Sequence, residues 1–179
     1  MQRTLLQFES IQEIMGGENL AVIMLTDESR QRAISSICDE SMTQQILLRL
    51  QSPDSCKNML PETLVEMLNG KYEMMIYGVH DGQYQVVLSD SEFERSVRIR
   101  FSDAILLNII AHYPLYIEET LMKRQCIPFD EKAKGVAIPI NTMDVPRLNL
   151  AMQKAVDEEN YELASKLRDE IKNRANHTI

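Results

Sequence analysis

The 179-residue sequence has few cysteines and no long run of apolar residues. Its three cysteines, Cys38, Cys56 and Cys126, are odd in number and far apart, so they indicate neither a disulfide framework nor a metal site. No stretch approaches the roughly 18 apolar residues that a membrane helix needs. The first residues also lack the apolar segment of a signal peptide. We therefore expect a cytoplasmic protein with no membrane attachment.

Positive charge is also scarce. The chain contains 19 Lys and Arg against 27 Asp and Glu, which gives a net charge of −8. Residues 1–146 carry the whole excess, because residues 147–179 contain six side chains of each sign. A body this acidic lacks the basic surface with which proteins hold nucleic acid tightly. The shortage argues less strongly against a nuclease whose carboxylates bind divalent cations.

The composition, 44% hydrophobic and 26% charged, is that of a folded globular protein with a core of its own. Strand-length apolar runs alternate with helical stripes, and His80-Asp81-Gly82 is the most specific hairpin signal. We predict an α+β fold with a mixed or mainly antiparallel sheet, packed helices and a C-terminal antiparallel helical hairpin. The expected strands are residues 4–15, 21–25, 33–38, 72–79, 83–88, 97–101, 115–117 and, more weakly, 136–140.

The expected helices begin near Asp39, Pro61, Ser102 and Glu118. Each has a stripe of apolar residues at helical spacing, which predicts one buried face per helix. The residues that we expect to be buried in the first two helices are Ile46, Leu47, Leu50, Leu64, Val65 and Leu68. We expect turns at Gly16-Gly17 and Asn69-Gly70.

The junction between the strand ending at Phe101 and the next helix is the best candidate site in the body. Arg100, Ser102 and Asp103 lie where backbone N–H groups at a helix N-terminus favour an anion such as phosphate. A purely structural interpretation also fits: Ser102 caps the helix, Asp103 complements the helix dipole and the arginine faces solvent.

The tail differs from the body. Apolar stripes at Leu148, Met152 and Ala155 and at Ala164 and Leu167 predict two helices separated near Glu159-Asn160. A pair this small has little core of its own, so we expect it to dock on another surface. That surface is either a partner protein or the chain's own body.

The tail resembles the UVR motif, a helical hairpin through which the excision-repair proteins UvrB and UvrC interact and which also occurs in Clp-type ATPases and their adaptors. The run YELASKLRDEI carries much of the resemblance. It implies a protein partner, which we expect to contact Tyr161, Glu162, Leu167, Arg168 and Asp169.

Residues 5–128 resemble the bifunctional nuclease (BFN) family. The resemblance is carried by the run Arg100-Phe101-Ser102-Asp103-Ala104-Ile105, which DGQYQVVL precedes and YPLYIEETLM follows. The resemblance implies a nuclease-like domain at residues 1–128, a linker at 129–146 and the UVR hairpin at 147–174. It also implies self-association into a homo-oligomer.

A low-specificity nuclease acting on DNA or RNA is one expectation from this resemblance. Asp103 and Glu40 would then bind Mg²⁺ or Mn²⁺, Arg100 would bind the phosphate and Ser102 would donate a hydrogen bond to it. The sequence lacks the His-Asp pair that the family usually carries before its middle helix. The alternative is therefore a non-catalytic adaptor with a nuclease-like body that acts through its UVR hairpin.

Overall fold

The computed structural model describes residues 2–13, 20–68, 70–90, 92, 94–131, 140 and 143–176. The strands are β1 (Arg3–Glu13), β2 (Leu20–Asp27), β3 (Arg32–Asp39), β4 (Tyr72–His80), β5 (Gln83–Asp90), β6 (Ser96–Arg100), β7 (Leu115–Glu118) and β8 (Ile127–Pro128). The helices are α1 (Glu40–Gln51), α2 (Leu60–Met67), α3 (Phe101–Ala111), α4 (Glu119–Gln125), α5 (Val145–Asp157) and α6 (Tyr161–Asn176), with a 3₁₀ turn at Pro53–Cys56.

The eight strands form one open sheet in the order β6-β5-β4-β7-β1-β2-β3-β8. Neighbouring strands are antiparallel except β4 and β7, which pair in parallel. The parallel pair arises because the chain leaves β4, forms β5, β6 and α3, and returns through β7 to the middle of the sheet. The predicted α+β class, with a mixed and mostly antiparallel sheet, is confirmed.

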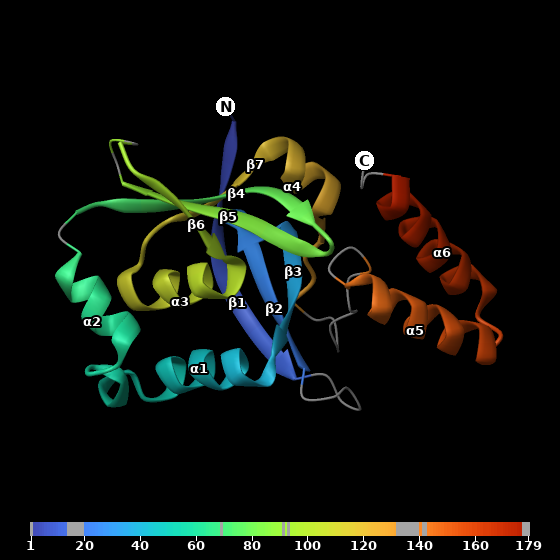
Figure 1. The fold of residues 1–179 in the computed structure, drawn as a ribbon, viewed down its shortest axis with the longest axis horizontal. Helices are drawn as coiled ribbons and strands as arrows, with labels where there is room; N and C mark the ends of the chain where they lie inside the picture. Colours follow the sequence, from blue (N-terminus) through green and yellow to red (C-terminus); the bar gives the residue numbers. More distant parts are fainter. Residues whose placement is uncertain are drawn as a thin grey trace.

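One hydrophobic core joins the sheet to helices α1, α3 and α4 (Figure 1). Ile46, Ile105 and Met122 are the largest fully buried side chains of these three helices. Leu115 and Ile117 of β7 are buried at the centre of the sheet, as their apolar run predicts. The β4–β5 turn takes positive φ at Asp81 (47°) and Gly82 (74°), the conformation that favours Asp-Gly in a two-residue hairpin turn.

The helical tail forms a hairpin at the opposite end of the molecule from α2 (Figure 1). Leu148 and Ala155 of α5 pack on Ala164 and Leu167 of α6 in a small separate core, which confirms the predicted pair. Asp144 caps α5 by accepting a 2.9 Å hydrogen bond from the Arg147 N–H. Asn160 accepts one from the Leu163 N–H at 3.2 Å near the start of α6.

Several local predictions are wrong. Helix α3 begins at Phe101 without a side-chain cap, so Ser102 is not its N-cap. Strand β6 lies at the sheet edge and ends at Arg100, so Phe101, the last residue of the predicted strand, belongs to the helix. Leu50 of α1 is exposed, and no residue of α2 is buried.

Four predicted features fall wholly or partly outside the described residues: the end of the strand at residues 4–15, the Gly16-Gly17 turn, the Asn69-Gly70 turn and the strand at residues 136–140. The domain boundaries stay a prediction. In the part of the chain that the structure describes, no helix is long and apolar enough to cross a membrane.

Candidate functional site

A cleft of about 540 Å³ opens where β6 passes into α3. Its opposite wall is the end of β3 and the start of α1, which lie far from β5 and β6 in strand order, so the curvature of the sheet brings the two walls together. The polar residues that line it are Ser36, Asp39, Gln83, Gln85, Arg98, Arg100 and Ser102.

Arg100 and Asp103, two of the predicted site residues, bind each other. The guanidinium donates two hydrogen bonds to the carboxylate, Nε to Oδ2 at 2.8 Å and Nη2 to Oδ1 at 2.9 Å. The hydrogen bonding to Asp103 raises the pKa of Arg100 above its ordinary value. Both side chains are partly exposed, and Arg100 lines the cleft, so this pair sets the direction of the arginine at the cleft wall.

The other two predicted residues, Ser102 and Glu40, do not both line this cleft. Ser102 lines the cleft, whereas Glu40 begins α1 and accepts a 3.2 Å hydrogen bond from the Gln44 amide. The cleft carboxylate at this wall is Asp39, which also caps α1 by accepting from the Met42 N–H at 2.8 Å. The structure therefore brings Arg100 and Ser102 together with Asp39 in one cleft.

Of the two predicted metal ligands, Asp103 does not fit a divalent cation in this arrangement. Mg²⁺ and Mn²⁺ need several oxygen ligands, and both Asp103 oxygens already accept hydrogen bonds from a guanidinium that repels a cation. Among the described residues, no three His, Cys, Asp or Glu side chains gather so that they could hold a metal ion.

Three of the side chains that line the cleft are buried: Tyr84, Phe101 and Cys38. The Tyr84 ring packs on Phe101 with centroids 5.1 Å apart, and its buried hydroxyl has no hydrogen-bond partner in the described structure. Burial raises the pKa of the Cys38 thiol to about 11, so this cysteine is a poor nucleophile at neutral pH. The cleft thus offers cationic, hydroxyl and amide groups for binding a polar or anionic ligand, without an activated thiol.

No sequence signal indicated Ser36, Gln83 or Gln85 as site residues, and Asp39 was predicted only as a residue near which a helix begins. These residues come from β3, β5 and the start of α1. Their proximity depends on how far the sheet curves, which no local pattern encodes.

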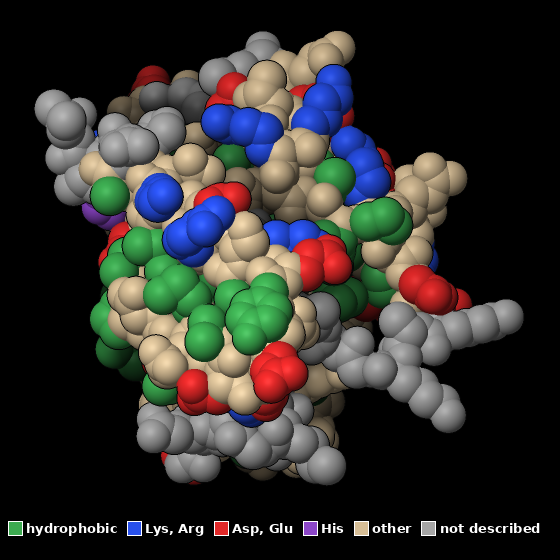
Figure 2. Space-filling model, turned by 90° about the vertical axis from the view of Figure 1, so that its right-hand side faces the viewer, with side chains coloured by type: hydrophobic (Ala, Val, Ile, Leu, Met, Phe, Trp, Pro, Cys, Tyr) green, Lys and Arg blue, Asp and Glu red, His purple; other side chains and the backbone are tan. Residues whose placement is uncertain are grey.

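The hairpin presents a second candidate surface. Leu150 and Val156 of α5 and Tyr161 and Leu163 of α6 are exposed although they are apolar. Figure 2 views the side of the molecule on which the hairpin lies, and hydrophobic side chains gather at the centre of this view with charged side chains around them. An exposed apolar group with a charged margin is typical of a protein-binding surface.

Four of the five predicted partner-binding residues are exposed, and one is buried. Tyr161 is exposed, as are Glu162, Arg168 and Asp169. The Lys166 hydrogen bond lowers the pKa of Glu162, and Arg168 pairs with Asp169 at 3.0 Å. Leu167 is buried between the two helices, so it holds the hairpin together and does not face a partner.

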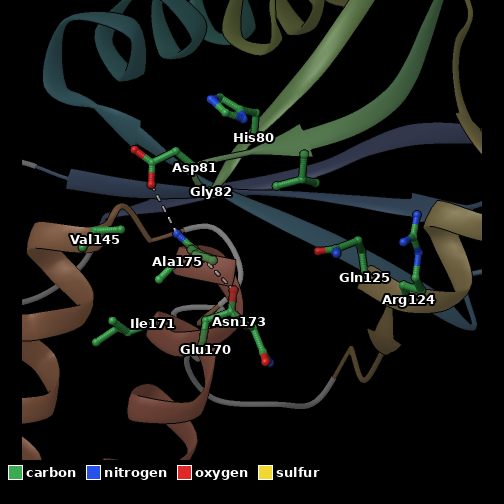
Figure 3. Close-up of a pocket in the computed structure, with 12 residues that line it drawn as sticks. His80, Asp81, Gly82, Arg124, Gln125, Val145, Glu170, Ile171, Asn173 and Ala175 are labelled. Atoms are coloured by element: carbon green, nitrogen blue, oxygen red, sulfur yellow. Dashed lines mark hydrogen bonds and ion pairs between the residues drawn. The ribbon is translucent and has the colours of Figure 1, made fainter. Parts of the chain in front are cut away.

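A cavity of about 780 Å³ separates the hairpin from the body, between the β4–β5 turn, the end of α4 and the last turns of α6. Asp81 Oδ1 lies 3.7 Å from Nη1 of Arg174 on α6. Figure 3 shows that the neighbouring His80 points away from α6. Arg174 is also bound by Glu170 at 2.8 Å. Arg174 thus pairs with Asp81 across the cavity and with Glu170 on its own helix.

A family model described as the UvrB/uvrC motif matches residues 145–173, which are the two helices of the hairpin. No curated protein matches the chain. The resemblance of the body to the bifunctional nuclease family has no support from these comparisons. The chain therefore carries a UVR motif on its C-terminal hairpin, and this motif suggests that the hairpin is a protein-interaction tail.

Proposed function

We propose that this protein is a cytoplasmic interaction protein that binds a partner protein on the outward face of α5 and α6. The observation that carries the proposal is that the UVR match falls on a hairpin that leaves four large apolar side chains exposed, Leu150, Val156, Tyr161 and Leu163. Removing these side chains from water lowers the free energy, and this happens only if another surface covers them.

The construction of the hairpin supports this role. Leu148 and Leu167 are buried between the helices and hold them together. The exposed apolar residues of both helices are therefore already in place before a partner binds. Preorganisation of this kind reduces the entropy lost on binding. The equal number of acidic and basic residues in the tail also gives the surface no net repulsion toward a charged partner.

The motif implies what kind of partner this is. UVR hairpins resemble one another, and they link the repair proteins UvrB and UvrC and occur in Clp-type ATPases. We propose that the partner presents a UVR hairpin or a helical surface of the same chemistry, with apolar side chains that meet Leu150 and Tyr161.

Isothermal titration of the full chain with purified UvrB, UvrC and a Clp-type ATPase of the same cell tests the proposal. We expect one of them to bind the wild-type chain, and Leu150→Gln and Tyr161→Ala each to weaken that binding by about 10-fold or more. Val97→Ser is the matched control, since Val97 is also exposed but lies on β6. Equal weakening by all three variants, or binding by none of the partners, contradicts the proposal.

A second candidate function is hydrolysis of phosphodiester bonds in DNA or RNA, in keeping with the resemblance of the body to the bifunctional nuclease family. The observation that favours it is that Arg98, Arg100 and Ser102 line the same cleft as Asp39. Two guanidinium groups suit a phosphate ester, and a hydroxyl group supplies a further hydrogen bond. Because both oxygens of Asp103 already accept hydrogen bonds from Arg100, no step is assigned to a metal ion.

Cleavage of labelled single-stranded DNA and RNA, measured with Mg²⁺, with Mn²⁺ and with chelator, tests this second function. The double variant Arg98→Gln/Arg100→Gln should abolish cleavage, while Arg168→Gln on the hairpin should leave it unchanged. Absence of cleavage by the folded wild-type chain under all three conditions excludes the nuclease for this protein.

A further inference from the structure

We propose that the outer edge of strand β6 binds an extended, acidic segment of a partner protein as an additional antiparallel strand. β6 is the last strand of the sheet, and in the described structure it pairs only with β5. Its five residues are exposed except for the half-buried Ile99, and Val97 is 60% exposed. A strand with one open side offers its unpaired N–H and C=O groups to another chain.

The hydrogen-bond pattern with β5 shows which backbone groups of β6 face outward. Just before β6, the Asp90 N–H donates a 3.2 Å hydrogen bond to the Arg95 carbonyl oxygen, so these two residues form a hydrogen-bonded pair. Such pairs alternate along an antiparallel ladder, so Val97 also directs its backbone groups to β5. Ser96 and Arg98, on either side of Val97, therefore direct their N–H and C=O groups to the open side.

Nothing in β6 blocks a further strand. Natural edge strands are protected by proline, lysine, a bulge or very short length. The opposite edge of the sheet is protected in this way, since β8 (Ile127–Pro128) has two residues and one of them is proline. β6 contains neither proline nor lysine, and its register with β5 is continuous. Of the two edges, β6 is therefore the one that can accept a strand.

Charge indicates that the added strand is acidic. Residues 95–100 contain three arginines and no acidic residue, although residues 1–146 as a whole carry an excess of acidic side chains. Arg100 is occupied by Asp103, whereas the exposed Arg98 side chain has no ion pair or hydrogen bond to any residue that the structure describes. A carboxylate directly opposite Arg98 would form a stabilising cross-strand pair.

Other occupants suit this edge less well. Two β6 strands that paired with each other would bring the arginines of both copies onto one face, opposite or diagonal to one another, and like charges in such positions destabilise a sheet. A nucleic acid would also meet the arginines, but its phosphate backbone lacks the alternating donors and acceptors that match those of Ser96 and Arg98. An acidic extended peptide satisfies both the backbone groups and the charge.

The pleat of the strand predicts how such a peptide lies. In an antiparallel hydrogen-bonded pair, the two opposite residues have side chains on the same face and direct their N–H groups at each other's carbonyl oxygens. A glutamate opposite Arg98 therefore donates its own N–H to β6, while the next residue of the peptide directs its N–H away. The side chain of that next residue lies on the face of Val97, so an apolar residue is favoured there. The expected ligand thus alternates acidic and apolar residues.

Fluorescence polarisation of the full chain with a labelled peptide of sequence TEVEVT tests the proposal. We expect saturable binding below about 100 μM, and binding at least about 10-fold weaker for TKVKVT, in which lysine replaces glutamate. Methylating the amide nitrogens of the two glutamates should abolish binding, whereas methylating those of the two valines should change it by less than about 2-fold. The two methylated peptides have the same composition and charge, so their comparison isolates the backbone contact.

Variants of the chain give a second measurement. Ser96→Pro removes an outward N–H and should weaken TEVEVT binding by about 10-fold or more. Its matched control is Ser96→Ala, which also loses the hydroxyl contact with Ser89 but keeps the N–H and should bind as the wild type does. Arg98→Gln should weaken binding by about 5-fold, whereas Arg124→Gln on α4 should not. Circular dichroism checks the fold of each variant.

Because Arg98 also lines the cleft, the methylated peptides and Ser96→Pro distinguish strand addition from binding of a carboxylate in the cleft. Several results would overturn the proposal: no binding of TEVEVT by the folded wild type, equal binding of TKVKVT, or methylated valines that weaken binding as much as methylated glutamates. Equal losses in Ser96→Ala and Ser96→Pro would also overturn it. None of these results bears on whether the hairpin binds another protein.

Discussion

Arg174 Nη1 of α6 lies 3.7 Å from Asp81 Oδ1 in the β4–β5 turn, and this ion pair links the hairpin to the body. The same guanidinium donates to the carbonyl oxygens of Met143 and of Ile140 and pairs with Glu170. Most of its named partners thus belong to the tail. Arg174 fixes the residues before α5 to the last turns of α6, and its contact with the body is the more exposed part of this network.

Changing Arg174 should therefore matter more than changing Asp81. We expect Arg174→Met to lower the stability of the hairpin by about 2 kcal/mol, because two backbone carbonyls and a carboxylate lose a largely buried donor. Asp81→Asn should cost about 0.5 kcal/mol or less, as for other exposed ion pairs. Hydrogen exchange of the α5 and α6 amides measures both. Equal effects would mean that the ion pair to the body, and not the carbonyl contacts, supports the hairpin.

The buried pair between Arg49 and Glu62 gives a second prediction. The Arg49 side chain is 2% exposed, so Glu62→Gln leaves a buried guanidinium without its compensating charge. We expect the free energy of unfolding in urea to fall by about 3 kcal/mol. Glu66→Gln, on the same helix but exposed, should change it by less than about 0.5 kcal/mol. If the two variants unfold at the same urea concentration, the pair does not stabilise α2.

Acid should destabilise the protein through Asp27 and Glu119. Burial tends to raise the pKa of Asp27, but hydrogen bonds from Arg32, Gln31 and Ser29 outweigh it and leave the pKa lowered. Hydrogen bonds from Thr4 and Arg32 lower the pKa of Glu119. Both carboxyl groups thus bind protons more readily in the unfolded chain, so their stabilisation is complete above about pH 5 and is lost as the pH falls through their folded pKa values.

The measurement is the free energy of unfolding between pH 6 and pH 3. Arg32 bridges the two carboxylates, with Nε 3.0 Å from Asp27 and Nη1 3.0 Å from Glu119. Arg32→Met should therefore reduce stability near neutral pH and flatten the dependence on pH. A variant that loses stability along the same curve as the wild type would assign the acid sensitivity to other groups.

The hairpin core can be tested against its surface. Leu167→Ala should destabilise the hairpin by about 2–4 kcal/mol, because it removes a fully buried side chain and leaves a cavity. Leu163→Ala, one turn earlier but exposed, should cost less than about 1 kcal/mol. Thermal unfolding followed by circular dichroism distinguishes them, and similar losses would show that Leu167 is not the main contact between α5 and α6.

The elements were largely predictable because their patterns are local. The apolar run of β7, the Asp-Gly turn and the stripes of the hairpin each depend on residues close together in the sequence. The start of α3 was not predictable in this way. Phe101, the last residue of the predicted strand, packs on Tyr84 of the neighbouring strand β5 and is the first residue of the helix, so Arg100 and not Ser102 takes the N-cap position.

Which apolar faces are covered was harder to predict. The stripe of Leu64 and Leu68 has the same spacing as a buried one, but periodicity only says that a face is apolar and not what lies against it. The cleft was hard to predict for a similar reason, because Asp39 and Arg100 come close only through the curvature of the sheet. Coverage and long-range proximity are therefore properties of the three-dimensional fold.

The central claim is that the outward face of the hairpin binds a partner protein. Its most direct test places a photocrosslinking amino acid at position 161, and separately at position 94 in the body as a control, and irradiates the full chain with the partner that titration identifies. Crosslinks from position 161 and none from position 94 are the predicted result. Crosslinks from position 94 alone would place the partner on the body and contradict the account.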